Sequence, residues 1–254
     1  MPYWWCSALL TVLSAVGIIN AINLIDGVNG LSSGFCIMAC AEFGGFFYCA
    51  GDITMVLLAA GCIGALIPFF FHNVFGKTSR MFIGDGGTLV MGLVMSVFVI
   101  HVLDSGSLCA VFAPEGFGLI PFALAVLAVP VFDTLRVMSV RVKNRVSPFH
   151  PDKTHLHHLF IDLGFSHIGT TLSILFLNAL VVGTFWVLYA VGVSISGQFY
   201  AVVALSFLVT FGLYYLVRWN ERRNTRFYRM LLRLGKASQF ERKGLFLRFQ
   251  FFLD

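Results

Sequence analysis

The sequence contains little charge. Of its 254 residues only 11% are charged, which is less than half of the roughly 25% found in soluble domains. Hydrophobic residues make up 58% of the chain, and the mean hydropathy is +0.87. A soluble fold of this size needs more polar side chains than this to cover its surface. The composition therefore excludes a disordered chain and a soluble globular domain, and it predicts a protein surrounded by lipid.

Paired cysteine motifs are also absent. The six cysteines include no Cys-x-x-Cys pair, and five of them lie inside apolar runs, with Cys109 just beyond one. Cys36 and Cys40 share a helix face, but a metal site there would lack further ligands. We therefore expect no disulfide framework and no cysteine metal site. The six side chains are interpreted as small apolar groups within packed helices.

The basic residues are unevenly distributed. The net charge of +5 arises from 17 Lys and Arg against 12 Asp and Glu, and ten of the 17 lie from Arg218 onward, directly after an apolar run. Basic residues in this position are typical of the cytoplasmic side of a membrane helix, where anionic lipids attract cations. The charge therefore indicates a membrane surface as partner and argues against nucleic acid.

Seven apolar runs are long enough to be membrane helices, which need about 20 residues. They cover approximately residues 4–22, 32–50, 53–72, 87–104, 117–137, 168–192 and 198–217. The sequence therefore predicts an all-α, polytopic membrane protein with about seven transmembrane helices in 1–217 and a basic tail in 218–254.

The basic loops predict the orientation. Lys and Arg occur in 73–86, 138–167 and the tail, whereas the loop near Asp52 and the loop 105–116 contain none. The positive-inside rule places the basic loops in the cytoplasm, and alternation adds the loop 23–31. We expect a multi-pass protein of the inner (cytoplasmic) membrane, with its C-terminus inside and its N-terminus outside.

The first of three polar segments carries Asn20, Asn23, Asp26 and Asn29 at three-residue spacing. Residues three apart are neighbours on a helix, so this spacing places several oxygen ligands on one face. Glycines at 27 and 30 let the backbone turn or approach a ligand closely. A polar helix end with caps and a turn is the equally supported alternative.

The second polar segment is Phe82-Ile-Gly-Asp-Gly-Gly-Thr88, in which Asp85 lies between glycines at the start of the fourth span. Backbone amides in a glycine-rich turn bind anions, and a carboxylate beside them attracts a hard cation such as Mg²⁺. Together they suit a metal-bound diphosphate. In the alternative interpretation Asp85 is a helix N-cap.

The third polar segment, 147–158, contains four of the seven histidines. On a helix His155 and His158 share a face, and His157 points elsewhere. The spacing does not match His-Glu-x-x-His and no cysteine is near, which argues against zinc. Imidazole and basic groups facing a phosphate are the preferred interpretation, and a solvated basic loop is the alternative.

Asp133 lies near the inner end of the fifth span, with Arg136 one turn later. A charge at mid-membrane costs about 2.5–3.5 kcal/mol on insertion scales and less near the ends. A structural pair between these two residues is favoured over a catalytic role for Asp133. Because the three polar segments follow or precede different spans at the same side, we expect them to converge in one active-site cleft at the cytoplasmic face.

In combination and in this order, these segments resemble the polyprenyl-phosphate N-acetylhexosamine-1-phosphate transferases, glycosyltransferase family four in the broad sense. The resemblance rests on NAINLIDGVNGL (20–31), FFHNVFGKTSRMFIGDGGT (70–88), VPVFDTLRV (129–137) and SPFHPDKTHLHH (147–158). The last segment is similar to the bacterial branch that transfers N-acetylglucosamine phosphate to undecaprenyl phosphate.

The resemblance implies a reaction in which undecaprenyl phosphate attacks the β-phosphorus of a UDP-N-acetylhexosamine. UMP leaves, and a lipid-linked diphosphate sugar forms for cell-envelope polysaccharide synthesis. By position, Asn23 and Asp85 resemble Mg²⁺ ligands, and Asp26 is a second acidic group of the site. The other implied roles are uracil contacts for Phe82 and Asn29, a weaker substrate contact for Asn73, and contacts to the diphosphate for His155, His157 and His158.

The sequence departs from the family pattern at its start. Family members have further N-terminal spans and an Asp-Asp pair, whereas this chain has no Asp-Asp dipeptide. An N-terminally truncated chain is the expected explanation. The alternative function is therefore a catalytically incomplete fragment that binds the nucleotide sugar or acts as a scaffold. A transporter is disfavoured because its polar residues should lie near the bilayer midplane. The particular UDP-sugar and a homodimer remain open.

Overall fold

The computed structural model describes residues 4–104, 107–108, 112, 116–147, 154–240 and 244–253. This part of the chain is helical and contains no strand. Its elements are α1 (Trp4–Leu24), α2 (Leu31–Ala50), α3 (Ile53–Phe75), α4 (Gly84–Leu103), α5 (Leu119–Val126), α6 (Ala128–Lys143), α7 (Leu156–Asp162), α8 (His167–Ala190), α9 (Ile195–Phe207), the π-helical turn η2 (Leu208–Gly212), α10 (Leu213–Arg222), α11 (Arg226–Ala237) and α12 (Gly244–Leu253).

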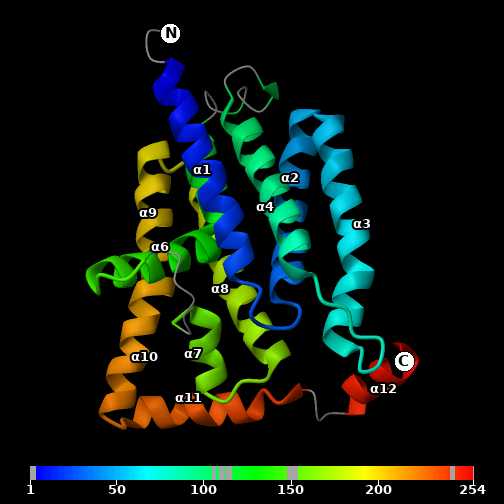
Figure 1. The fold of residues 1–254 in the computed structure, drawn as a ribbon. Helices are drawn as coiled ribbons and strands as arrows, with labels where there is room; N and C mark the ends of the chain where they lie inside the picture. Colours follow the sequence, from blue (N-terminus) through cyan, green and yellow to red (C-terminus); the bar gives the residue numbers. More distant parts are fainter. Residues whose placement is uncertain are drawn as a thin grey trace.

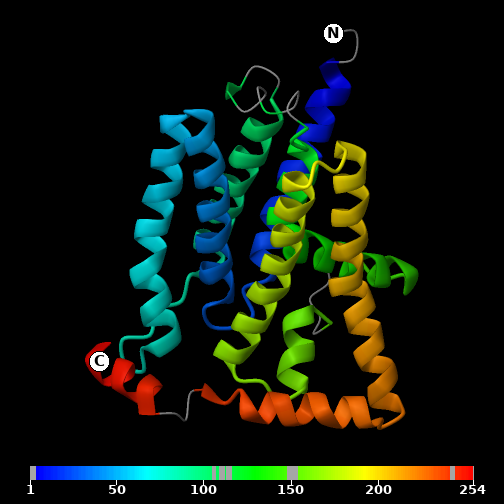
Figure 2. The same cartoon turned by 180° about the vertical axis from the view of Figure 1, so that it is seen from behind.

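The long helices form one bundle with two distinct ends (Figures 1 and 2). Helices α1 and α3 finish, and α2, α4 and α8 begin, at the end where α11 lies; we call it the polar end. Six helices of the described chain are long and apolar enough to cross a membrane, and the bent pair α5–α6 makes a seventh candidate. The prediction of a polytopic all-α membrane protein is confirmed.

The fifth predicted span is not one straight helix. Over 117–137 the structure has α5 and α6, which meet at an angle of 76°. Helix α6 runs crosswise at the middle of the bundle in both views (Figures 1 and 2). Since α4 ends and α8 begins at opposite ends of the bundle, the segment between them still carries the chain across.

The break between α5 and α6 has a clear cause in the sequence. Pro130 has no N–H, and its ring clashes with the carbonyl of residue 126 in a continuous helix. The groups freed at the break are satisfied by Asn178 of α8, a fully buried side chain. Its amide nitrogen donates to the Val126 carbonyl at 2.9 Å, and its amide oxygen accepts from the Val129 N–H at 2.9 Å. An amide side chain within an apolar span therefore stabilises the bend.

An aromatic core packs the half of the bundle away from the polar end. The Phe43 ring lies 5.6 Å from Phe98 and 5.7 Å from Phe122, and Phe117 lies 5.1 Å from Phe185. These rings come from α2, α4, α5, α8 and the segment before α5, so they fix the helices relative to one another. Aromatic pairs at such distances stabilise beyond their buried area. This rigid half supports the loops at the polar end.

Candidate functional site

The first polar segment is only half helical. Helix α1 ends at Leu24, so Asn20 and Asn23 lie on the helix, whereas Asp26 and Asn29 lie in the turns before α2. The helical spacing that was expected to place several oxygen ligands on one face therefore stops after Asn23. The chain leaves the helix here because Gly27 and Gly30 interrupt it.

Two contacts hold this turn in place. Asp26 accepts a hydrogen bond of 2.5 Å from the Ser32 hydroxyl in the first turn of α2. Asn73 of α3, which is buried, accepts from the Gly30 N–H at 2.5 Å and donates to the Met81 carbonyl at 2.7 Å. The Asn73 amide therefore ties the first polar segment to the second through backbone groups.

Gly30 adopts a left-handed backbone (φ 78°), and a Cβ atom there would lie 2.5 Å from Val74 Cγ2. Gly51 at the opposite end has nearly the same φ, 77°, with open space around it. Both Gly→Ala substitutions incur backbone strain of about 1–2 kcal/mol, but only Gly30→Ala adds a clash beside the Asn73 contact. We expect a clearly lower melting temperature in detergent for Gly30→Ala than for Gly51→Ala. Equal shifts would contradict the tight packing of this turn.

The second polar segment leads into α4. Asp85 is the second residue of α4, while the N-cap position is Ile83, which makes no side-chain cap. The interpretation of Asp85 as an N-cap is therefore wrong. One turn later the buried Thr88 hydroxyl donates to the amide oxygen of Asn23. This contact joins the end of α1 to the start of α4 and brings Asn23 close to Asp85.

The carboxylates of Asp26 and Asp85 interact electrostatically. Partial burial raises the pKa of Asp26, and the negative charge of Asp85 raises it further, against the opposing effect of the Ser32 hydrogen bond. Two carboxylates that repel each other favour a cation between them. No group of three His, Cys, Asp or Glu suited to a metal occurs in the described chain. Two carboxylates with the Asn23 amide oxygen fit a hard cation that retains water and substrate oxygens as its other ligands.

A small polar cavity is lined in part by Asp26. Its volume is about 130 Å³, and its lining residues are Asp26, Gly27, Val28, Asn29, Asn73, Phe82 and Ile83. Phe82 is 75% exposed, an unusual position for a large aromatic side chain that lines a polar cavity. Asn29 is fixed through its backbone: its carbonyl accepts from the Thr171 hydroxyl at 2.9 Å, and its N–H donates to His167 Nδ1 at 3.3 Å. The first two segments thus share one hollow.

The third polar segment is anchored by Asp133 of α6. Its Oδ2 lies 3.0 Å from His155 Nδ1 and accepts from the Leu156 N–H at 3.0 Å. Its Oδ1 accepts from Arg136 Nη2 at 2.7 Å, and the Arg136 guanidinium lies 3.8 Å from the centre of the Tyr214 ring. The predicted Asp133–Arg136 pair is confirmed, and it also orients a histidine.

The three histidines stand close together. His155 is the residue before α7, and its ring stacks on that of His157 at 5.6 Å, while His157 and His158 lie 4.3 Å apart. His157 therefore lies between the other two, and the expectation that His157 points elsewhere is wrong. A Cβ at Gly27 would clash with His157 Nε2. The third segment thus packs directly on the turn of the first. Residues 148–153 of the predicted motif lie outside the described residues.

Burial, together with the neighbouring His158 and His155, lowers the pKa of His157 from 6.5 to about 3, against the opposing charge of Asp133. A histidine whose pKa falls on folding binds its proton more tightly in the unfolded chain, so acid destabilises the fold. We expect stability to decline as the pH drops below 6.5 towards 3. In His157→Asn the decline should be shallower, as measured by melting temperature against pH. Parallel profiles for both proteins would contradict a buried neutral His157.

Four residues that contact the site were not identified from the sequence. Ser32 donates a hydrogen bond to Asp26, Thr88 donates one to Asn23, and His167 accepts one from the Asn29 N–H. The Tyr214 ring lies against the Arg136 guanidinium. Thr88 could have been predicted from the sequence, because it follows Asp85 by three residues and so shares its helix face. The Ser32 contact spans one turn, whereas the His167 and Tyr214 contacts depend on tertiary packing.

These features define a class of protein: a multi-pass membrane protein whose polar segments converge at one end of a helical bundle. Residues 1–103 match the model of glycosyl transferase family 4. Over these residues the chain is similar to this family, as the resemblance of its motifs implied. No solved structure matches the chain.

Three relatives illustrate the similarity. A probable undecaprenyl-phosphate N-acetylglucosaminyl 1-phosphate transferase of Bacillus subtilis is 32% identical over 171 residues, 67% of this chain and 45% of the relative. A decaprenyl-phosphate N-acetylglucosaminephosphotransferase of Mycolicibacterium smegmatis is 36% identical, over 66% of this chain and 44% of the relative. An undecaprenyl-phosphate alpha-N-acetylglucosaminyl 1-phosphate transferase of Escherichia coli K12 is 28% identical, over 62% of this chain and 41% of the relative. The chain spans less than half the length of these relatives.

Proposed function

We propose that this chain carries the nucleotide-sugar site of a transferase that moves an N-acetylhexosamine 1-phosphate, most simply N-acetylglucosamine 1-phosphate, from its UDP-sugar to undecaprenyl phosphate. An oxygen of the lipid phosphate attacks the β-phosphorus of the UDP-sugar. The bond from that phosphorus to the bridging oxygen breaks, and UMP leaves with the electron pair. The observation that carries the proposal is the convergence of three polar segments at one end of the bundle.

Asn23 and Asp85 are the proposed Mg²⁺ ligands, with Asp26 as a second acidic group facing the same space. Bound Mg²⁺ supplies positive charge that offsets the charge developing on the diphosphate. The support is the donor set: two interacting carboxylates and the Asn23 amide, whose oxygen is held by Thr88.

Phe82 and Asn29 are the proposed contacts to uracil. The Phe82 ring is exposed and lines the polar cavity together with Asn29. An exposed aromatic face stacks on a base without needing hydrogen bonds. Asn73 lines the same cavity, but its amide oxygen and nitrogen are both engaged by backbone groups. We therefore assign Asn73 to positioning the two segments that bind substrate.

The histidines are proposed to face the diphosphate. In the neutral ring, Nδ1 of His155 donates to Asp133, because a carboxylate only accepts. Its Nε2 is then left with a lone pair and is buried without a partner in the described chain. Such an atom is placed to hold or move a proton on a phosphate oxygen. His157 and His158 extend the same row of imidazoles.

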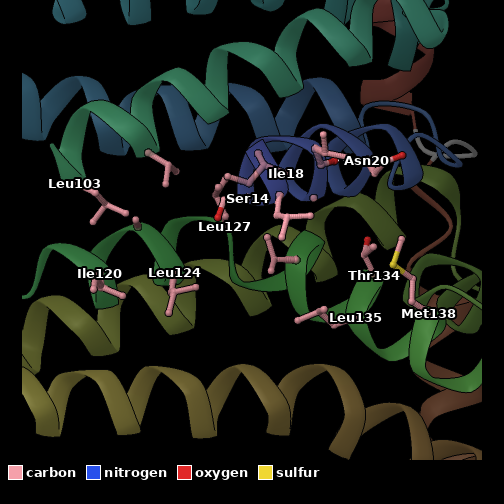
Figure 3. Close-up of a pocket in the computed structure, with 16 residues that line it drawn as sticks. Ser14, Ile18, Asn20, Leu103, Ile120, Leu124, Leu127, Thr134, Leu135 and Met138 are labelled. Atoms are coloured by element: carbon pink, nitrogen blue, oxygen red, sulfur yellow. Dashed lines mark hydrogen bonds between the residues drawn. The ribbon is translucent and has the colours of Figure 1, made fainter. Parts of the chain in front are cut away.

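A second, apolar cavity suits the polyprenyl chain of the acceptor. It has a volume of about 590 Å³ and lies between α1, α4, α5 and α6. Only Ser14, Asn20 and Thr134 among its 16 lining residues are polar, and Asn20 and Thr134 lie at the end away from Leu103 and Ile120 (Figure 3). Asn20 is one turn before Asn23. A lipid in this cavity would therefore place its phosphate near the proposed metal site.

The polar end is proposed to face the cytoplasm from the inner membrane, where UDP-sugars are available. The basic segment from Arg218 lies at this end, in agreement with the positive-inside rule.

The test uses membranes that contain this chain, with labelled UDP-N-acetylglucosamine, undecaprenyl phosphate and Mg²⁺. Binding of the sugar nucleotide and formation of lipid-linked product are measured separately. Product formed above the level of control membranes supports transfer. Mg²⁺-dependent binding without product supports the alternative, a nucleotide-sugar-binding portion of a longer or multi-chain enzyme. Absence of Mg²⁺-dependent binding contradicts the proposed site.

A further inference from the structure

Helix α11 has a surface that the transfer reaction does not use. Its N-cap is Thr225, whose hydroxyl accepts from the Tyr228 N–H at 3.2 Å, and the helix lies crosswise at the polar end of the bundle (Figure 1). Its far end is tied to the segment between α7 and α8, where the Ser166 hydroxyl donates to the Ser238 carbonyl at 2.7 Å and Gln239 donates to the Gly164 carbonyl at 2.9 Å. The helix is therefore fixed at both ends rather than being a loose tail.

The sequence of α11 places two different stripes on its surface. Phe227, Met230 and Leu234 are 36%, 48% and 51% exposed. Each follows directly after an exposed arginine, so the apolar and basic stripes lie about 100° apart around the helix. The basic stripe consists of Arg226, Arg229, Arg233 and Lys236. In the described chain no carboxylate pairs with these four residues.

The remaining face of α11 is already occupied by the protein. Tyr228, Leu231 and Leu232 pack against the hydrophobic core, and Gly235 is buried against Leu163 and Phe165. The two exposed stripes therefore need a partner that offers negative charge and apolar groups side by side. The headgroup layer of an anionic bilayer has both, since phosphates lie directly above acyl chains.

The depth of α11 fits that layer. The apolar helix from Ile195 to Arg222 has 28 residues, which corresponds to about 42 Å and matches the roughly 40–45 Å of a bilayer with its headgroups. Only Arg223, Asn224 and Thr225 separate this helix from α11, so α11 starts at headgroup level. Trp219, half exposed near the end of this span, lies 4.2 Å beneath the Arg223 guanidinium. Exposed tryptophans are typical of the membrane interface.

We propose that α11 lies flat in the headgroup layer of the leaflet at the polar end and binds anionic lipid. The basic stripe contacts lipid phosphates, and Phe227, Met230 and Leu234 enter the boundary with the acyl chains. Helix α12 continues this arrangement, because Phe246 and Phe249 pack on Phe75 of α3 while Phe251 is 89% exposed. This proposal does not depend on the transfer reaction.

The experiment uses the full chain with its six cysteines replaced by alanine and one cysteine introduced, Met230→Cys or Arg229→Cys, each labelled with bimane. These adjacent positions lie on the apolar and basic stripes, respectively, and serve as matched probes. Both proteins are placed in vesicles of phosphatidylcholine with an equal part of phosphatidylglycerol, after circular dichroism shows native helix content. We expect doxyl-lipid quenching to be severalfold stronger at 230 than at 229, and iodide quenching to show the reverse. Equal iodide access at both positions would overturn the proposal and leave the apolar stripe free for a protein partner.

The charge requirement is tested with the label at 230. Replacing phosphatidylglycerol by phosphatidylcholine should weaken lipid quenching, and Arg229→Gln with Arg233→Gln should remove the difference between the two vesicles. Lipid quenching that is independent of both changes would show burial without recognition of anionic lipid, which contradicts the proposed binding.

Discussion

Replacing Asp85 by asparagine is expected to lower sugar-phosphate transfer by about 10²–10³-fold, the usual effect of losing one electrostatic group that stabilises a transition state. The substitution keeps size and hydrogen bonding but removes a charge that interacts with Asp26 and with the proposed Mg²⁺. The fold should be retained, because Asp85 caps no helix and is exposed at the start of α4. Additional Mg²⁺ should restore part of the activity, since the ligand Asn23 and the nearby negative charge of Asp26 remain.

Asp104→Asn is the matched control. Asp104 is the residue after α4, at the end of the same helix remote from the proposed site. Transfer should be unaffected by this change. In a preparation that binds the UDP-sugar without transferring it, Asp85→Asn should raise the Mg²⁺ concentration needed for half-maximal binding, and Asp104→Asn should not. A folded Asp85→Asn protein with normal transfer or normal Mg²⁺ dependence would exclude Asp85 as a metal ligand.

The second large effect is expected for stability. Asp133→Ala removes the partner of Arg136, whose side chain is completely buried. A buried charge left without its partner typically destabilises a protein by about 3–5 kcal/mol. The same substitution frees His155 Nδ1 and the Leu156 N–H. Denaturant titration in detergent micelles should therefore show a large loss of unfolding free energy, or little folded protein.

Asp162→Ala provides the comparison for Asp133→Ala. Asp162 accepts from Arg218 at 2.7 Å, but its side chain is 51% exposed. Exposed pairs contribute at most about 1 kcal/mol. Similar losses for the two substitutions would show that the Asp133 network does not hold α6 and α7 together.

The sequence predicted the architecture well where composition determines it. Runs of apolar residues are long enough to identify the membrane helices. Only the fifth differs from its prediction, because the structure has two helices at an angle where one straight span was expected. Its break depends on Pro130, visible in the sequence, and on Asn178 of a distant helix, which supplies the hydrogen bonds that make the bend stable. Such a partner cannot be inferred from local patterns, because it lies 52 residues from the carbonyl it satisfies.

The structure tests the predicted geometry of the candidate site, and it differs from that prediction at several residues. The helical spacing of Asn20, Asn23, Asp26 and Asn29 suggested one face, but glycine ends the helix first. The place of His157 between its neighbours depends on how α7 packs against Gly27. Asn73 was predicted as a substrate contact, while the structure shows its amide engaged by two backbone groups. Side-chain type suggested the proposed chemistry, and tertiary packing determines which atoms remain available for it.

The most direct measurement is electron paramagnetic resonance of Mn²⁺, used in place of Mg²⁺, bound to this chain in lipid nanodiscs with UDP-N-acetylglucosamine. The central claim is that Asn23, Asp26 and Asp85 form one site for a metal-bound diphosphate. The claim predicts immobilised Mn²⁺ with hyperfine coupling to the phosphorus nuclei of the nucleotide, and loss of the immobilised signal in Asp85→Asn. A spectrum that shows only hydrated or nucleotide-bound Mn²⁺ in free solution, unchanged by the protein, would contradict it.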